Sequence, residues 1–150
     1  MFNIRTARYQ DNAFIKAVFE AVLPLYKDLL PGTFEANIQN MDILTDKGYA
    51  FEACGMSGYI IEVEQQAIGF AAVGLFSPQL AYLAALHFLP EFQRQGYGAR
   101  SMQDLETRYR NQKVQELVLM VHREAGWAID FYTKLNYRLI ADEASAIVTY

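Results

Sequence analysis

The feature that most constrains the fold is a strand, a glycine-bearing loop and a helix, which the sequence predicts in succession between residues 83 and 110. The apolar run Leu83 to Leu89 is too short for a helix and precedes Pro90, so it predicts a buried strand that ends there. Two glycines stand in the loop Gln93 to Gly98, and apolar residues recur at helical spacing after it. Glycines let a backbone approach a ligand closely, and the N–H groups of such a loop suit a phosphate. A phosphate-binding loop and a simple tight turn both fit this pattern.

Hydrophobic periodicity predicts further elements on both sides of this unit. Pro24 should kink or split the first helix, and Asn136 suits the left-handed C-cap of the last one. In order, we predict a strand over 2–8, helices over 14–29 and 33–44, strands over 59–64, 67–76 and 83–89, a helix from 99 to 112, a strand over 116–122, a helix over 127–135, and strands over 137–141 and 146–150. The order β-α-α-β-β-β-α-β-α-β-β predicts an α/β fold with a mixed central sheet flanked by helices, in a single domain spanning residues 1–150.

The composition excludes several functional classes. The chain has 150 residues, of which 53% are hydrophobic, which indicates a compact globular protein. Its net charge of −4 argues against non-specific binding to nucleic acid, which needs a basic face. Cys54 is the single cysteine, which fits a reducing compartment. No apolar run has the length of a membrane span or the character of a signal peptide. We therefore expect a cytoplasmic protein that binds neither nucleic acid nor membranes and holds no metal.

Two motifs resemble the GNAT superfamily of N-acetyltransferases. The spacing from Pro90 through Gln93 to Gly96 and Gly98 is similar to the acyl-CoA loop of that family, Q/R-x-x-G-x-G/A. The stretch from Ala128 to Tyr137, AIDFYTKLNY, resembles the A-x-x-F-Y-x-x-x-G-F helix that closes the acyl-CoA site. The resemblance implies a GNAT-like fold, acetyl-CoA as the co-substrate and an amine as the acceptor.

The resemblance also implies which residues form the site. The strand would splay from its neighbour at Leu86 to Phe88, leaving its backbone open to the amide-bearing arm of the cofactor. The Phe88 N–H would polarise the thioester carbonyl. Tyr132 would protonate the departing thiolate, which suits a phenol with a pKa near 10. The implied cofactor-binding residues are Leu86, Phe88, Gln93, Arg94, Gln95, Gly96, Tyr97, Gly98 and Ala99.

Two positions of the second motif depart from the family pattern. Ala125 stands where the family often has an asparagine, so one polar contact to the cofactor is lost. Asn136 replaces a glycine, which is a mild change because asparagine also accepts a left-handed backbone.

The general base is the least defined part of the predicted site. The strand positions that often carry a glutamate or histidine in the family hold Ala84 and Tyr82. Tyr82 could relay a proton through water, and His122, at the C-terminal end of its strand, is a second candidate. A purely structural role is the alternative for both. His87 alternates to the face opposite Phe88 and is predicted to be a packed histidine.

These residues predict an N-acetyltransferase that moves acetyl from acetyl-CoA to a primary amine by direct attack. The acceptor could be a small molecule or a peptide amine, and a homodimer is compatible with the sequence. One alternative is a non-catalytic acyl-CoA-binding or sensing module on the same fold. Another is a nucleotide-binding α/β protein with a coincidental G-x-G, although it would lack a Walker lysine.

Overall fold

A computed structural model of the chain describes residues 1–29, 32, 35–36, 55–142 and 147–149. Most of the second predicted helix, Thr33 to Leu44, lies outside the described residues, as does Cys54. The strands are β1 (Phe2–Thr6), β2 (Ser57–Val63), β3 (Gln66–Ser77), β4 (Leu80–Phe88), β5 (Glu116–His122), β6 (Ala141–Asp142) and β7 (Ile147–Thr149).

The strands form one sheet in the order β1-β2-β3-β4-β5-β7-β6. Neighbours pair antiparallel except β4 and β5, which are parallel and are connected by a helix. The predicted α/β architecture with a mixed central sheet is therefore confirmed. The strand that precedes the glycine-bearing loop, β4, lies inside the sheet, between β3 and β5.

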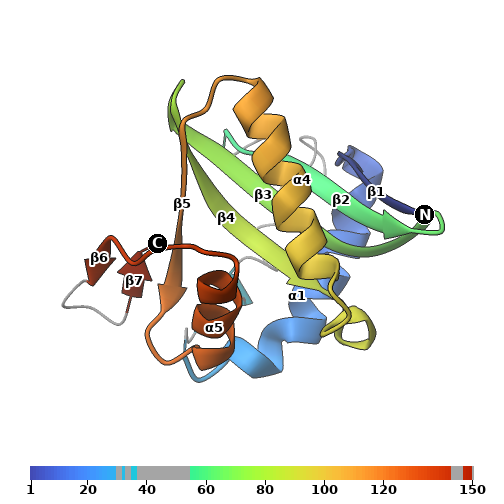
Figure 1. Cartoon of the computed structure of the whole chain (residues 1–150). Coiled ribbons are helices and arrows are strands. Elements are labelled where there is room, and N and C mark those ends of the chain that lie inside the picture. The colour runs from blue at the N-terminus through green and yellow to red at the C-terminus, as the bar shows by residue number, and fades with distance from the viewer. Residues whose placement is uncertain (30–31, 33–34, 37–54, 143–146, 150) are drawn as a thin grey trace.

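Helices cover both faces of this sheet (Figure 1). The helix α1 (Asn12–Tyr26) lies against one face, and α4 (Tyr97–Asn111) crosses the other. The helix α5 (Gly126–Lys134) follows β5 and lies on the same face as α4. Short 3-10 turns, η1 (Tyr9–Asp11) and η3 (Pro90–Phe92), precede α1 and α4 in the chain. The two faces are called the α1 face and the α4 face below.

Each face has its own apolar core. On the α4 face, Met102, Leu105 and Tyr109 of α4 pack on sheet residues such as Ile61 and Leu83. On the α1 face, the cluster consists of Ala7, Ile15, Val18, Phe19, Val22, Ile60, Phe70 and Ala72. Because side chains alternate between the faces of a strand, β2 and β3 contribute to both cores.

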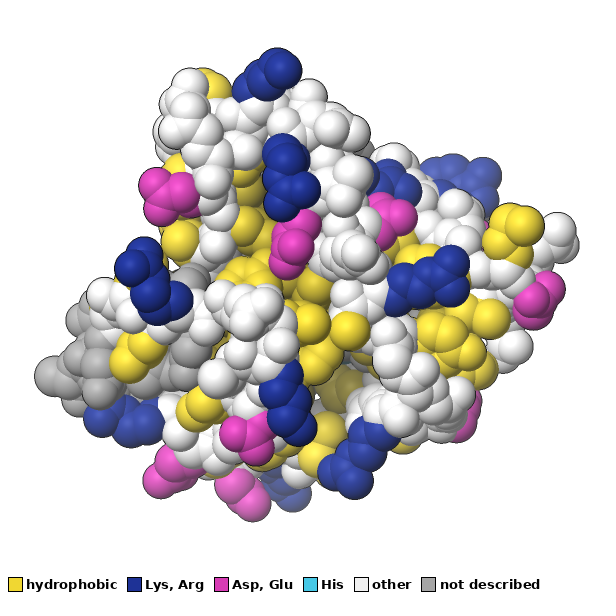
Figure 2. Space-filling view, viewed as in Figure 1, with side chains coloured by type: hydrophobic (Ala, Val, Ile, Leu, Met, Phe, Trp, Pro, Cys, Tyr) yellow, Lys and Arg dark blue, Asp and Glu magenta, His cyan; other side chains and the backbone are white. Residues whose placement is uncertain are grey.

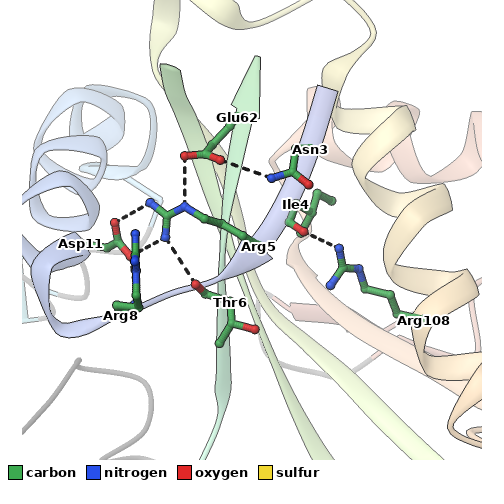
Figure 3. Close-up of polar contacts among 8 residues, drawn as sticks. All are labelled: Asn3, Ile4, Arg5, Thr6, Arg8, Asp11, Glu62 and Arg108. Carbon is green, nitrogen blue, oxygen red and sulfur yellow. Dashed lines mark hydrogen bonds and ion pairs between the residues drawn. The ribbon is translucent and has the colours of Figure 1, made fainter. Parts of the chain in front are cut away.

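A network of charged side chains fastens the first strand (Figure 3). The Arg5 guanidinium bonds both carboxylate oxygens of Asp11 at 2.8 Å, and its Nε donates to Glu62 at 3.0 Å. The Arg8 N–H also donates to Asp11, at 2.7 Å. On the other side of β1, Arg108 of α4 donates to the Ile4 carbonyl. These bonds join β1 to the turn before α1, to β2 and to α4.

Several local predictions were wrong by a few residues. Pro24 does not split α1, which runs unbroken to Tyr26. Proline costs a helix one backbone hydrogen bond, and here that loss falls in the last turn. The hairpin turn is Glu64-Gln65 rather than Gln65-Gln66, and both turn residues have positive φ. β4 begins at Leu80, earlier than predicted.

Two differences occur at the ends of helices and strands. No regular strand covers residues 137–140, since β6 begins at Ala141. The helix α4 ends at Asn111, one residue before its predicted end, and the left-handed residue after it is Lys113, with φ of 70°. The predicted cap at Asn136 is confirmed, with φ of 68° directly after the last turn of α5.

Candidate active site

The parallel strands β4 and β5 separate halfway along their length and form a fork. Their ladder runs from the pair Leu80–Glu116 to the pair Leu83–Leu119 and ends there. At the same point β4 carries a bulge, because Ala72 pairs with Ala85 and Val73 pairs with Leu83, which leaves Ala84 without a partner. A bulge bends its strand and increases the local twist, so it directs the rest of β4 away from β5. Figure 1 shows the two strands diverging toward their C-terminal ends.

The separated half of β4 presents an open backbone edge to this fork. Leu89 donates its N–H to the carbonyl of Ile68 on the β3 side. Since backbone groups alternate along a strand, the N–H groups of Leu86 and Phe88 point to the opposite edge, into the fork. Leu86 and Phe88, the positions at which the family resemblance implies an open edge, thus have donors available to an extended, amide-bearing ligand.

The N-terminus of α4 lies beside the same end of β4. Gly96 caps the helix in a left-handed conformation with φ of 85°, and a Cβ atom there would meet nothing within 4 Å. The N–H groups of Tyr97, Gly98 and Ala99 find no acceptor in the described part of the chain. Free donors at a helix N-terminus suit an anion, so the loop fits the pyrophosphate of a coenzyme A molecule.

Two contacts attach this loop to the fork. The Gln93 side-chain amide donates to the Phe88 carbonyl at 3.1 Å, which ties the loop to the end of β4. At Gly98, a Cβ atom would lie 3.0 Å from the Phe131 ring of α5 and 3.8 Å from Phe88. The absence of a side chain at Gly98 therefore lets α4, β4 and α5 meet.

Tyr132 is held in the α4-face core by α5. Its side chain is only 8% exposed, and its ring packs edge-on against Phe131 and Tyr137 at 4.9 and 5.6 Å. Burial raises the pKa of the Tyr132 hydroxyl, and the nearby Tyr26 hydroxyl raises it further. Tyr132 is thus a protonated phenol near neutral pH, and its O–H is a hydrogen-bond donor.

On the α1 face, aromatic side chains from three elements meet near the fork. The Tyr26 ring, at the end of α1, makes T-shaped contacts with His87 at 5.6 Å and with Trp127 of α5 at 5.8 Å. His87 also packs near Phe19 and Phe70, and burial lowers its pKa to about 4, so its ring is neutral near pH 7. The predicted packing of His87 on the face opposite Phe88 is confirmed.

The two candidate bases lie on the two different strands of the fork. Tyr82 lies in the paired half of the strand, stacked on Phe76 at 4.4 Å, and about 20 Å of strand separates it from Phe88. His122 ends β5, and its Nδ1 accepts the Glu124 N–H at 3.1 Å, which holds the turn into α5. Both roles stay predictions, and the placement favours neither.

The predicted cations differ in their surroundings. Arg94 is exposed within the loop, with φ of 60°, so its side chain is free of the core. Arg100, which is also near the loop in sequence, lies 4.5 Å over the Phe2 ring instead. This cation–π contact directs Arg100 toward β1.

The surface near these elements is hollowed and mainly apolar (Figure 2). Hydrophobic side chains gather between α4 and α5, and a recess opens beside α5. A separate hollow of about 300 Å³, bordered by Glu106, Arg110 and Tyr137, lies toward the far end of α4. The chemistry described above belongs to the fork, because the open β4 edge and the free N–H groups of α4 are there.

Two aromatic residues near the site were missed in the sequence. Tyr26 and Trp127 belong to elements far apart in the chain, and neither stands in a position that the two motifs specify. Of the two, only Trp127, directly before the second motif, could have drawn attention in the sequence; the residue is 43% exposed in the structure.

The described residues hold no helix long and apolar enough to cross a membrane. Within the same residues, no group of three histidine, cysteine or acidic side chains could hold a metal ion.

Comparisons with solved structures place this fold among acetyltransferases. The PaiA N-acetyltransferase of Thermoplasma acidophilum, in complex with coenzyme A, is 16% identical, with a TM-score of 0.75 over 99% of this chain and 97% of that chain. An acetyltransferase of Thermus thermophilus is 17% identical, with a TM-score of 0.77 over 100% and 95%. The ribosomal-protein-S18-alanine N-acetyltransferase of Escherichia coli is 15% identical, with a TM-score of 0.73 over 99% and 91%. At such low identity these likenesses show a shared fold.

A search of curated proteins by sequence finds no match. The model of the acetyltransferase (GNAT) family, however, matches residues 19–137. Because this match covers most of the chain and the structure has the fork, the loop and the helices of the predicted fold, the protein belongs to the acetyltransferase (GNAT) family and is an acyl-CoA-dependent N-acetyltransferase.

Proposed function

We propose that this protein transfers an acetyl group from acetyl-CoA to a primary amine by direct attack at the fork between β4 and β5. The observation that carries the proposal is the end of the β4–β5 ladder at Leu83 and Leu119. Within the described residues it leaves the N–H groups of Leu86 and Phe88 without a β5 partner, beside the α4 N-terminus. One domain, residues 1–150, would hold the whole site, and the single cysteine supports a cytoplasmic location.

The residues would divide the binding of the co-substrate among them. The N–H groups of Tyr97, Gly98 and Ala99, with the open left-handed Gly96, would hold the pyrophosphate. Gln95 and Arg94, exposed on the same loop, would border it, and Gln93 would keep the loop against Phe88. The edge of β4 at Leu86 would pair with the amides of the arm.

Two groups would act on the reaction itself. Acetyl-CoA supplies the acetyl group as a thioester with a thiolate leaving group. The Phe88 N–H would donate to the carbonyl oxygen as negative charge develops there. The amine nitrogen forms the new C–N bond, and the electron pair of the C–S bond leaves with sulfur. Tyr132 would give its proton to that sulfur and regain one from solvent, while the amine loses its surplus proton to solvent.

The positions of the two candidate general bases, Tyr82 and His122, give no support to either role. Tyr82 lies in the paired half of β4, about 20 Å along the strand from Phe88, and the Nδ1 of His122 already accepts the Glu124 N–H, so the proposal gives the deprotonation of the amine to water. The acceptor would be a small molecule or a peptide; the S18-alanine acetyltransferase is a relative in fold with a protein acceptor by its name.

The test is release of free CoA thiol from acetyl-CoA in the presence of a panel of primary amines. The panel would hold alkylamines, arylalkylamines, a polyamine, peptides with a free N-terminus and peptides with an internal lysine. Amine-dependent thiol release and an N-acetylated product seen by mass spectrometry would support the proposal. CoA binding with no turnover across the panel would favour the acyl-CoA-sensing alternative.

A further inference from the structure

The helix α5, which carries Tyr132, lies beside α4 (Figure 1) and is attached to it at two places. The Phe131 ring lies against Gly98 in the first turn of α4, where a Cβ atom would come within 3.0 Å of it. Just after α5, the Tyr137 hydroxyl donates to the Glu106 carboxylate of α4 at 2.6 Å. Gly98 and Glu106 are about 12 Å apart along α4, at 1.5 Å per residue. Tyr132 therefore lies in the chain between two attachments to the same helix.

The second attachment also contacts Tyr132 directly. The Tyr137 ring packs edge-on against the Tyr132 ring, with the ring centroids 5.6 Å apart. The Tyr137 N–H donates to the Tyr132 carbonyl at 3.0 Å, and the left-handed backbone of Asn136 allows the chain to return in this way. Tyr137 is thus bonded to α4 through its hydroxyl and packed on Tyr132 through its ring.

Tyr132 depends on such packing for its orientation. Among the described residues its hydroxyl makes no hydrogen bond, so no polar partner aims it. The helix α5 has only 9 residues, and a helix this short needs tertiary contacts to be stable. A general acid acts only when its proton lies within hydrogen-bond reach of the atom that receives it. The residues that hold the Tyr132 ring in place therefore bear on its proposed role.

The bond between Tyr137 and Glu106 is suited to hold this ring. A carboxylate accepts a hydroxyl proton more strongly than a neutral oxygen does. Burial, which is the largest cause, and the hydrogen bond to Glu106 both raise the pKa of Tyr137, so its hydroxyl keeps the proton that it donates. The bond therefore persists near neutral pH and connects α4 to the Tyr137 ring.

We propose that Glu106 is a positioning residue for the general acid: by accepting the Tyr137 O–H it fixes the ring on which Tyr132 packs, and so keeps the Tyr132 hydroxyl aimed at the leaving sulfur. Glu106 itself gains and loses no proton in the reaction. Neither sequence motif contains Glu106, and its role follows only from its bond to Tyr137, the last residue of the second motif. This inference rests on the proposed role of Tyr132 as the acid.

Turnover of acetyl-CoA with the best acceptor of the amine panel tests the proposal in variants of the two bonded residues. Tyr137→Phe keeps the packed ring and removes only the hydroxyl, and Glu106→Ala removes the acceptor. We expect each to lower kcat about tenfold, with the Kd for acetyl-CoA and the acceptor KM unchanged, because a displaced acid no longer reaches the sulfur. The double variant should be no slower than either single variant, since both substitutions remove the same bond.

Two further variants show whether the bond itself is responsible. Glu106→Gln keeps an oxygen that can accept the Tyr137 O–H, so kcat should stay within about twofold of the wild-type value. Tyr59→Phe is the matched control, because the Tyr59 hydroxyl pairs with that of Tyr109 of α4 at 2.7 Å. The substitution removes a comparable tyrosine bond of α4 but none to Tyr137. It should lower the free energy of unfolding and leave kcat unchanged.

A readout that needs no turnover follows the Tyr132 ring itself. With tyrosine labelled by ¹³C at Cζ, Glu106→Ala should move or broaden the Tyr132 resonance in the free protein, and Tyr132→Phe assigns that resonance. Glu106→Gln should leave it in place. A role of Glu106 in stability alone would lower the free energy of unfolding and leave the Tyr132 resonance of the folded protein unchanged.

The outcomes separate this proposal from the one on which it rests. Wild-type kcat in folded Glu106→Ala, an equal loss in Glu106→Gln or in Tyr59→Phe, or an unmoved Tyr132 resonance would overturn it. A loss from Glu106→Ala that persists in the Tyr132→Phe background would also overturn it, because Glu106 would then act through another group. If Tyr132→Phe by itself kept wild-type turnover, the role of Tyr132 as the acid would fail first, and the resonance would still report whether Glu106 holds its ring.

Discussion

Leu83 of β4 and Leu119 of β5 form the last pair of the parallel ladder, and the backbone bulge at Ala84 follows immediately. Leu83 and Leu119 are both buried on the α4 face, so packing fixes the point at which the strands part. Everything that the proposed chemistry uses lies beyond this pair: the open edge of β4, the α4 loop and the helix that carries Tyr132.

Because β3 approaches the end of β4 closely, we expect a side chain added at Gly69 to disturb both the fold and the site. A Cβ atom there would lie 2.5 Å from the His87 carbonyl oxygen and 2.6 Å from the Phe88 ring, so β4 must move. We expect Gly69→Ala to cost about 1–3 kcal/mol in the free energy of unfolding and to lower turnover by displacing Phe88. Urea unfolding and thiol release measure the two effects. Gly126→Ala, where a Cβ meets nothing within 4 Å, is the control and should be neutral; equal costs would show that Gly69 is not tightly enclosed.

The bond from Gln93 to Phe88 predicts a contribution to co-substrate affinity. A neutral hydrogen bond contributes about 0.5–1.5 kcal/mol, and 1.4 kcal/mol is about tenfold in a binding constant. Gln93→Ala should therefore weaken acetyl-CoA binding by up to about tenfold, as measured by calorimetry. Thr107→Ala removes a similar but exposed bond, from Thr107 to the Gln103 carbonyl within α4, and should change the Kd less than twofold. Equal effects at both positions would contradict a special role for Gln93.

The open left-handed position at Gly96 permits a test of charge that holds shape nearly constant. Aspartate and asparagine are similar in size, and both tolerate positive φ better than other residues do. A carboxylate beside the pyrophosphate would repel it, so Gly96→Asp should bind CoA at least about tenfold more weakly than Gly96→Asn at low salt. The difference in CoA affinity between the two variants should become smaller at high salt, because screening weakens the repulsion. Equal CoA affinities for the two folded variants at low salt would place the pyrophosphate elsewhere.

The network at β1 predicts a pH-dependent contribution to stability. The hydrogen bond from Arg5 is the largest cause that lowers the pKa of Asp11, and burial opposes it. Because the pKa of Asp11 is lower in the folded state than in the unfolded state, its ionised carboxylate stabilises the fold at pH values above the unfolded pKa, about 4. This stabilisation is lost as the pH falls through the folded-state pKa. Asp11→Asn should therefore cost about 2 kcal/mol at pH 7, and its deficit relative to wild type should shrink below pH 4.

Chemical unfolding of both proteins at pH 7 and pH 3 measures that deficit. Glu64→Gln is the control, because Glu64 pairs with the N-terminal amine on the exposed surface and should have no measurable effect. A deficit for Asp11→Asn that stays constant from pH 7 to pH 3 would show that the charge of Asp11 is not what stabilises β1.

The strand, glycine-bearing loop and helix between residues 83 and 110 were predictable because the sequence signals for them are local. A short apolar run ending at Pro90, two nearby glycines and helical periodicity each restrict the backbone over a few residues. By contrast, the sequence carries no residue-type signal for the bulge at Ala84, since alanine fits any strand. The splay was therefore expected from the family resemblance and not from the residues themselves.

The aromatic contacts beside the fork could not be predicted for a different reason. Tyr26 and Trp127 belong to helices far apart in the chain, so neither local pattern contains the contact between their rings. At Pro24, by contrast, a local signal was present but was overridden. Proline tends to break helices, but in the last turn of α1 it removes little hydrogen bonding and does not split the helix. The roles of Gln93 and Gly98 also became specific only when Phe88 and Phe131 were placed against them.

The central claim is that Tyr132, at the fork, serves the leaving thiolate, and single-turnover measurement of Tyr132→Phe with acetyl-CoA and the best amine acceptor tests it most directly. The substitution keeps the buried ring and removes only the hydroxyl. A general acid contributes about 100-fold or more in rate, so the single-turnover rate constant should fall by about that factor while calorimetry gives an unchanged Kd for acetyl-CoA. Wild-type turnover by the folded variant under chemistry-limited conditions would contradict the account and leave Tyr132 a packing residue.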